Sequence, residues 1–216
     1  MLTITNEDNM ELMARYPDNY FDLAIVDPPY GIDIAEKLAN GWVSKAGGTN
    51  FKSKDWDKYT PTKEYWDELF RTSKNQIIWG GNYFMSKIQR DSPCWIFWDK
   101  KNGDSLFADG EIAWTSFNSP IRLIKIHWCG SAAKHETGKN KIHPTQKPIA
   151  LYKWLLDKYA KQGDKILDTH LGSGSIAIAC HDYGFDLTAC ELDKEYFDKA
   201  MQRINNHISQ QKLAFN

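Results

Sequence analysis

The sequence contains one short motif with a specific chemistry, Asp27-Pro28-Pro29-Tyr30. The exocyclic amine of a nucleobase is a poor nucleophile, because its lone pair is conjugated with the ring. The Asp27 carboxylate and the Pro28 carbonyl are two acceptors that can hold both amine hydrogens and favour a pyramidal, reactive nitrogen. Proline suits this task, since it has no N–H and its fixed φ sets the direction of the carbonyl. Tyr30 offers a ring for stacking on the base. A purely structural Pro-Pro turn is the alternative.

A second motif, Leu171-Gly172-Ser173-Gly174-Ser175, has the composition of a loop that approaches a ligand. Its glycines allow a ligand close to the backbone, and the start of the following helix supplies free N–H groups with partial positive charge. Glu191 follows Gly172 by 19 residues, the spacing at which an acid accepts hydrogen bonds from ribose hydroxyls. Together they favour an adenosine-containing cofactor over an ordinary tight turn. The Walker pattern of nucleoside triphosphate sites does not occur in the sequence.

Both motifs follow predicted strands. Residues 21–27 form a near-continuous apolar run, typical of a buried parallel strand, and Pro28-Pro29 must end it because two ladder donors are missing. Residues 165–170 are predicted as a strand, 175–184 as a helix and 186–192 as the next strand, which together make a βαβ unit. Open α/β sheets bind their ligands at the carboxyl ends of such strands. Further predicted elements are a strand at 2–5 and helices at 7–16, 149–160 and 194–210. Antiparallel hairpin strands are predicted at 76–81, 94–99, 111–117 and 121–128. Their tryptophans are expected in the core rather than as platforms for a base: Trp79, Trp95, Trp98, Trp114 and Trp128.

The composition is that of a soluble globular protein. The chain has 216 residues, of which 42% are hydrophobic and 25% charged, which suits one domain with a core large enough for a cofactor cavity. It has no long apolar run, and residues 1–10 lack the basic and apolar parts of a signal peptide. The cysteines form no Cys-x-x-Cys pair, which argues against a zinc site or a disulfide framework. We expect a reduced, cytoplasmic protein without a membrane segment or a bound metal.

The charges are unevenly distributed along the chain. The formal net charge is −1, but the stretch from Arg122 to Lys147 contains six Lys or Arg residues and a single acid, Glu136. This stretch is predicted either as a solvated loop or as a basic lip that holds phosphates. The candidate phosphate-binding residues are Arg122, Lys134, Lys139 and Lys141.

Four segments in this order resemble a known family: residues 27–30, His143-Pro144-Thr145-Gln146-Lys147-Pro148, residues 168–175 and Glu191. The family is that of the amino-group DNA methyltransferases, which methylate N6 of adenine or N4 of cytosine with S-adenosylmethionine (SAM). The catalytic motif precedes the cofactor loop, which resembles the permuted β subgroup and its small phage and prophage members. The resemblance covers nearly the whole chain. It implies a Rossmann-like α/β fold with a mostly parallel sheet and an antiparallel strand near one edge.

The resemblance also implies which residues bind SAM. Gly172, Ser173 and Gly174 would pack under its methionine part, Asp168 would end the strand beneath them, and Glu191 would hold the ribose. Two further groups of residues match cofactor-binding positions of the family. Asp8 and Asn9 match positions near the adenine. Thr145, Gln146 and Lys147 match the segment that reaches the amino-acid end of SAM. The Thr145 hydroxyl and the Lys147 ammonium group suit the carboxylate at that end.

Two features depart from the family pattern. The family usually has Pro-Phe after the motif aspartate, whereas this chain has Thr169-His170. His170 is expected beside the cofactor, where a protonated ring would oppose the sulfonium charge. The region before His143 is also short for a target-recognition module, so specificity would be relaxed or completed by a second subunit. We expect residues 1–216 to form a single methyltransferase domain, with a short target-recognition or mobile region within 32–141 and a homodimer as the candidate assembly.

The sequence therefore leads to a functional hypothesis. The protein is expected to be a site-specific DNA adenine-N6 methyltransferase, of the kind found in restriction-modification systems and phages, which acts on a flipped adenine with DNA as its partner. N4-cytosine methylation by the same residues is the nearest alternative. Methylation of RNA or of a protein glutamine, and a non-catalytic module that binds SAM or DNA, are the others.

Overall fold

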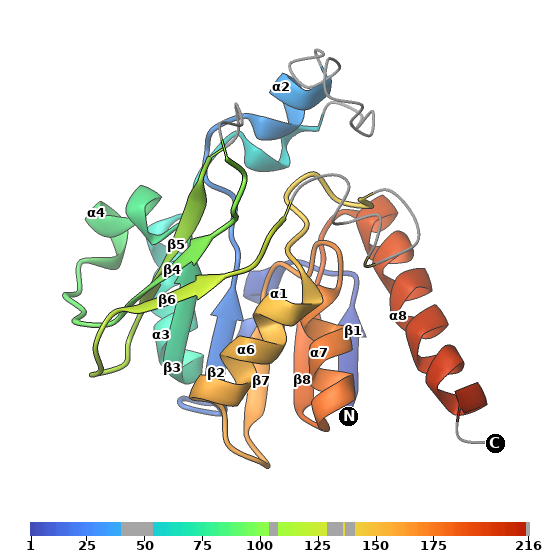
Figure 1. The fold of residues 1–216 in the computed structure, drawn as a ribbon. Coiled ribbons are helices and arrows are strands. Elements are labelled where there is room, and N and C mark those ends of the chain that lie inside the picture. The colour runs from blue at the N-terminus through green and yellow to red at the C-terminus, as the bar shows by residue number, and fades with distance from the viewer. Residues whose placement is uncertain (40–53, 104–107, 129–135, 137–140, 215–216) are drawn as a thin grey trace.

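The structure, a computed structural model, describes residues 1–39, 54–103, 108–128, 136 and 141–214. In this part of the chain, eight strands form one sheet in the order β1-β8-β7-β2-β3-β5-β4-β6 (Figure 1). The strands are β1 (Leu2–Thr5), β2 (Phe21–Val26), β3 (Ser73–Trp79), β4 (Trp95–Asp99), β5 (Gly110–Thr115), β6 (Arg122–Lys125), β7 (Lys165–Asp168) and β8 (Asp186–Cys190).

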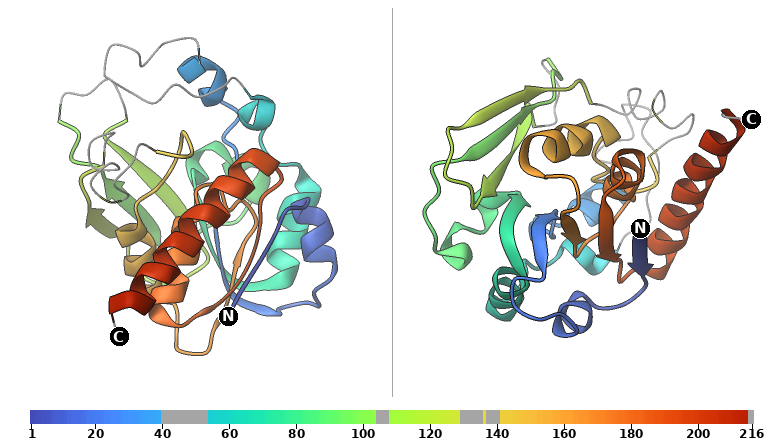
Figure 2. Two further views of the ribbon diagram at one scale, coloured as in Figure 1. Left: turned by 90° about the vertical axis from the view of Figure 1, so that its right-hand side faces the viewer. Right: turned by 90° about the horizontal axis from the view of Figure 1, so that it is seen from below.

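Helices cover both faces of the sheet (Figure 2). They are α1 (Asn9–Ala14), α2 (Ile34–Ala39), α3 (Lys63–Thr72), α4 (Met85–Ile88), α6 (Ile149–Tyr159), α7 (Ser175–Tyr183) and α8 (Lys194–Ala214), with short 3₁₀ turns at Asp55–Asp57 and Gly81–Tyr83. None of the helices in the described residues is long and apolar enough to span a bilayer.

The direction of the strands confirms the predicted fold class. Every strand pairing is parallel except those of β5, which runs antiparallel to both β3 and β4. The sheet is therefore mostly parallel, with one antiparallel strand near an edge, as expected for a Rossmann-like α/β fold. The predicted hairpin between β5 and β6 is wrong. Both edges of β5 are already paired, so β6 lies on the far side of β4 and runs parallel to it.

The core has two parts, one on each face of the sheet. Alternating residues of β2 separate them: Leu23 and Ile25 pack with α6, α7 and α8, whereas Ala24 and Val26 pack with α1 and α3. This alternation explains the continuous apolar run, since both faces of a central parallel strand are covered by helices. The tryptophans expected in the core are buried, apart from the half-buried Trp95.

Candidate active site

A cavity of about 570 Å³ lies beyond the carboxyl ends of β1, β2, β7 and β8. Its volume is that of a site for a small molecule or a cofactor. Asp27 and Pro29 after β2 line it, and so do residues 169–173 after β7 and Glu191 after β8. The fold thus brings the Asp27 motif and the Gly172 loop, far apart in the sequence, to one cavity.

Most of the predicted site residues line this cavity. Those that do are Asp8, Asn9, Asp27, Pro29, Thr145, Gln146, Lys147, His170, Gly172, Ser173 and Glu191. Pro28, Tyr30, Asp168 and Gly174 lie next to lining residues in the chain but are not part of the lining.

The Asp27 carboxylate is held by two side chains. Lys147 Nζ lies 2.5 Å from Asp27 Oδ2, and the Tyr30 hydroxyl donates a hydrogen bond to Oδ1 at 2.7 Å. Burial raises the pKa of Asp27, and the Lys147 ammonium group opposes this rise. Lys147 was expected to face a carboxylate of the cofactor, but here it faces a carboxylate of the protein.

The Tyr30 ring packs inside the protein. It stacks on Tyr83, with 4.9 Å between the ring centroids and 17° between the planes. Gly80 approaches the ring so closely, at φ +69°, that a Cβ there would collide with it. The stacking of Tyr30 on a base stays a prediction, whereas the contact of its hydroxyl with Asp27 is a positioning role that the sequence did not reveal.

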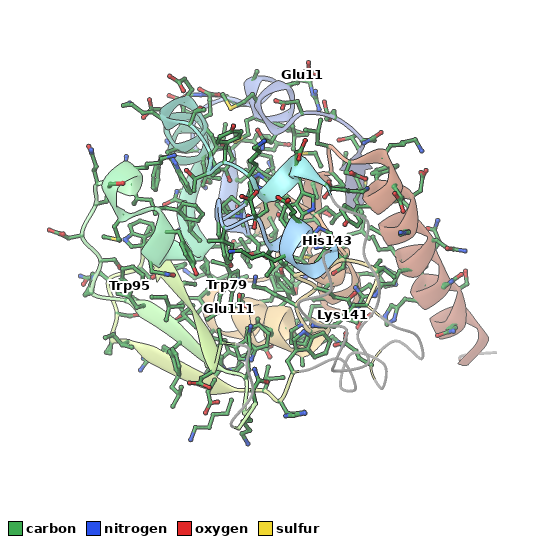
Figure 3. All side chains as sticks on the ribbon, turned by 90° about the horizontal axis from the view of Figure 1, so that it is seen from above. Glu11, Trp79, Trp95, Glu111, Lys141 and His143 are labelled. Atoms are coloured by element: carbon green, nitrogen blue, oxygen red, sulfur yellow. The ribbon has the colours of Figure 1, made fainter. Side chains whose placement is uncertain are left out.

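Glu111, on β5, completes a buried charge cluster. Its Oε2 lies 3.0 Å from Lys147 Nζ and its Oε1 lies 2.5 Å from Lys100 Nζ. Burial alone would raise the pKa of Glu111, but Lys147 and Lys100 lower it to about 2. In Figure 3, which looks onto this end of the sheet, Glu111 lies beside Trp79, whose ring centroid is 5.5 Å from Lys147 Nζ.

The antiparallel direction of β5 explains why Glu111 reaches this site. Trp79, the last residue of β3, pairs with Ala113, so the first residues of β5 lie beside the last residues of β3. The sequence offered one signal for this role of Glu111, namely a charged residue at the start of a strand, 111–117, that was predicted to be antiparallel.

The Gly172 loop is held by Glu191. Glu191 Oε2 accepts a hydrogen bond from Gly172 N–H at 2.8 Å, and Oε1 accepts one from Asp193 N–H at 2.9 Å. Gly172 and Gly174 have φ of +54° and +74°, values that favour glycine. Glu191 therefore positions the loop, and its carboxylate also lines the cavity. Its contact with a ribose stays a prediction.

His170 belongs to a buried hydrogen-bond chain. Its Nδ1 lies 2.9 Å from Thr169 Oγ1, which lies 2.7 Å from the Tyr65 hydroxyl, and Asn9 Nδ2 lies 3.1 Å from His170 Nε2. Burial lowers the pKa of His170 to about 3, so the ring is neutral at pH 7. The positive charge considered from the sequence is therefore absent from this side chain. Asp168, beneath the loop, has its pKa raised by burial to about 8.

Two further residues were missed by sequence reasoning. Asp57 is 2% exposed and accepts hydrogen bonds from the backbone N–H groups of Tyr30, Gly31 and Ile34, at 2.7, 3.1 and 2.9 Å. It thereby fixes the turn that follows the Asp27 motif. Trp56, its neighbour, lines the cavity. The sequence had placed both residues only within a target-recognition or mobile region at 32–141.

The structure describes two of the four candidate phosphate-binding residues. Arg122 is exposed on β6, and Lys141 Nζ lies 5.5 Å from the Trp128 ring centroid. Lys134 and Lys139 lie outside the described residues. Neither Arg122 nor Lys141 lines the cavity.

Comparisons with known proteins point to the family that the sequence motifs resemble. The family described as "DNA methylase" (N6_N4_Mtase) matches residues 99–202. The Type II methyltransferase M2.LlaDCHI of Lactococcus lactis subsp. cremoris is 25% identical, over 94% of this chain and 88% of the relative. The Type II methyltransferase M.HpaI of Haemophilus parainfluenzae is also 25% identical, over 93% of this chain and 73% of the relative. The chain is therefore similar to the N6/N4 amino-methyltransferases, in residues 99–202 to the family as a whole and over nearly its full length to individual members.

Solved structures of methyltransferases share the fold of this chain. The M1.HpyAVI–SAM complex has a TM-score of 0.61 at 20% identity and covers 94% of this chain and 100% of that chain. The PvuII DNA methyltransferase (cytosine-N4-specific) has the same TM-score at 12% identity, and the match covers 97% of this chain and 92% of that chain. The family match at 99–202 includes the Gly172 loop and Glu191, while the match to full-length relatives extends to nearly the whole chain.

Proposed function

We propose that this protein is a DNA methyltransferase that transfers a methyl group from SAM to N6 of an adenine flipped out of the duplex. The observation that carries the proposal is the shared cavity, where the Asp27 carboxylate and the Gly172 loop with Glu191 face the same space. One end suits a base amine and the other an adenosine-containing cofactor. The relatives are named methyltransferases, and M1.HpyAVI is described in complex with SAM.

The residues present fit SAM. Among the described residues, the Gln146 side-chain nitrogen is a buried donor without a hydrogen-bond partner, and Gln146 lines the cavity. Such a donor is costly unless a ligand supplies an acceptor. It suits the carboxylate of the methionine part, because Lys147 is already paired with Asp27. Asp8 and Asn9 would face the adenine, the Gly172 loop would pack under the methionine part, and Glu191 would hold the ribose.

SAM, when bound, supplies a methyl group on a positively charged sulfur. Asp27 accepts a hydrogen bond from the base amine and Pro28 a second one through its carbonyl, which turns the nitrogen lone pair towards the methyl group. Asp27 would also receive the proton that the amine loses. Correct positioning of the two reactants supplies much of the acceleration. Flipping the base costs a few kcal/mol of stacking.

Adenine is preferred over cytosine because the motif begins with Asp, which in this family is associated mainly with adenine. N4-cytosine methylation by the same residues is the second candidate, since the amine chemistry is identical and one structural neighbour is named cytosine-N4-specific. Digestion of methylated DNA followed by mass spectrometry of the nucleosides distinguishes N6-methyladenine from N4-methylcytosine.

The test of the proposal is methyl transfer from radiolabelled SAM to unmethylated DNA, with Asp27→Ala as the comparison. We expect the wild type to label DNA, and Asp27→Ala to bind SAM in calorimetry without labelling DNA. An Asp27→Ala variant with near-normal turnover would refute the role of Asp27. A wild type that binds SAM or DNA without methylating any DNA would instead be a non-catalytic module. Long-read sequencing of DNA from cells that express the protein would give the modified base and its sequence context.

A further inference from the structure

Both oxygens of the Asp27 carboxylate are engaged in the structure. Oδ1 accepts the hydrogen bond of the Tyr30 hydroxyl and Oδ2 pairs with Lys147. A base amine that binds to Asp27 must therefore share or displace one of these partners. The Lys147 ammonium group is the stronger competitor, because it is charged and its side chain is only 2% exposed.

Glu111 offers the same ammonium group a second acceptor. Lys147 Nζ is 2.5 Å from Asp27 and 3.0 Å from Glu111, so a small movement of one side chain changes which carboxylate holds it more closely. The hydrogen atoms of an ammonium group can serve both acceptors, and the charge need not leave its buried surroundings. Glu111 is itself held in place by Lys100.

Resting on the proposed function, we propose that Glu111 is a positioning residue for methyl transfer: it takes Lys147 from Asp27 when the base amine arrives. Asp27 is then free to accept the hydrogen bond of the amine, and Lys147 remains paired. Without the charge of Glu111, Asp27 would be the only counterion of Lys147 in the part of the chain that the structure describes. The amine would then have to compete with a buried ion pair.

The charges around Asp27 are consistent with this exchange. Asp27 and Glu111 carry two negative charges, and Lys147 and Lys100 carry two positive charges, so the cluster is balanced. The negative charge of Glu111 raises the pKa of Asp27 and that of Lys147 lowers it. The titratable groups that act on Asp27 from the elements around it are Tyr30, Glu111, Lys147, Tyr152 and Asp168.

The test is Glu111→Gln, which keeps the shape of the side chain and removes its charge. We expect kcat for DNA methylation to fall, on the order of 10- to 100-fold, the size of loss that a small misplacement of a reacting group causes. SAM affinity by calorimetry should be unchanged, because Glu111 does not line the cavity. The acidic limb of the pH profile of kcat should move to lower pH, since the pKa of Asp27 falls when the negative neighbour is lost. Glu111→Asp, which restores the charge, should recover part of kcat.

A matched control is Glu68→Gln, which removes a carboxylate paired with Arg71 on α3. It should leave kcat and the pH profile unchanged. Wild-type kcat and an unshifted acidic limb in Glu111→Gln would overturn the proposal. So would an equal loss of SAM affinity, kcat and melting temperature, which is the result of a merely structural role. If the wild-type protein does not methylate DNA, the proposed function fails and this inference fails with it. If the wild type methylates DNA and Glu111→Gln keeps its kcat and pH profile, only this inference fails.

Discussion

Replacing Lys147 with Met tests whether the buried charge cluster exists as described. Methionine keeps an unbranched side chain of similar length and removes the ammonium group that lies between Asp27 and Glu111. Both carboxylates are largely buried, with side-chain exposures of 15% and 22%, and the lysine is 2% exposed. The variant leaves Lys100 as the remaining cation of the cluster, in contact with Glu111.

The expected cost follows from this burial. Removing one partner of a buried ion pair typically costs about 3–5 kcal/mol, because the other charge remains without compensation. The variant can reduce the cost by taking up a proton, most readily on Asp27, whose pKa burial already raises. A carboxyl group whose pKa is higher in the folded than in the unfolded protein lowers stability as pH rises between the two values. The loss relative to the wild type should therefore be large near pH 8 and smaller near pH 5.

The assay is urea unfolding of the wild type and the variant near pH 5 and pH 8. The matched control is Lys74→Met, which breaks a pair with Asp22 in which the lysine is 52% exposed. Exposed pairs contribute about 0–1 kcal/mol, so this control should lose little stability at either pH. The reasoning would be refuted if Lys147→Met lost no more stability than Lys74→Met, or if its loss did not shrink towards pH 5.

Three other changes have expected outcomes. Asp57→Ala removes the acceptor of three backbone hydrogen bonds. It should lower the free energy of unfolding in urea by about 2–4 kcal/mol and slow methyl transfer. Unchanged turnover would contradict the role of Asp57 in positioning the turn after Asp27. Asp168→Asn should flatten the fall in melting temperature between pH 5 and pH 9, because the pKa of Asp168 is raised to about 8 and its ionisation opposes folding as pH rises; a slope equal to that of the wild type would contradict this. His170→Phe should leave the pH dependence of SAM affinity, measured by calorimetry between pH 6 and 8, unchanged, because the His170 ring is already neutral. If the affinity of the wild type falls as pH drops towards 6 and the His170→Phe variant does not show this fall, His170 is protonated.

The backbone features around the site that the sequence predicted are those set by local chemistry. Two consecutive prolines end β2, and the glycine loop needs the left-handed backbone seen at Gly172 and Gly174. Parallel strands then place both segments at one edge of the sheet. The common cavity of Asp27 and the Gly172 loop follows from these few facts. The role of each residue towards SAM and DNA does not, and it rests on the proposed function.

The parts that the sequence did not predict depend on pairings between distant segments. The side of β4 on which β6 lies depends on which strand edges are still open, and no local pattern records this. Asp57 reaches the backbone of Tyr30 across 27 positions of the chain. A carboxylate in a polar segment has the same local signature whether it faces solvent or holds a turn.

Lys147 shows most clearly where local reasoning stops. Its residue type and neighbours predicted a carboxylate partner, and a carboxylate partner is present, but Asp27 and Glu111 supply it. The physical reason is burial: Lys147, two residues before α6 in the lining of the cavity, must be neutralised before any ligand arrives, since an unpaired buried charge is costly. A site that needs a cation near its ligand must therefore also hold the counterions of that cation when the ligand is absent. By this argument the partners of Lys147 are protein acids at the carboxyl end of the sheet, and the antiparallel strand β5 is what brings the second of them there.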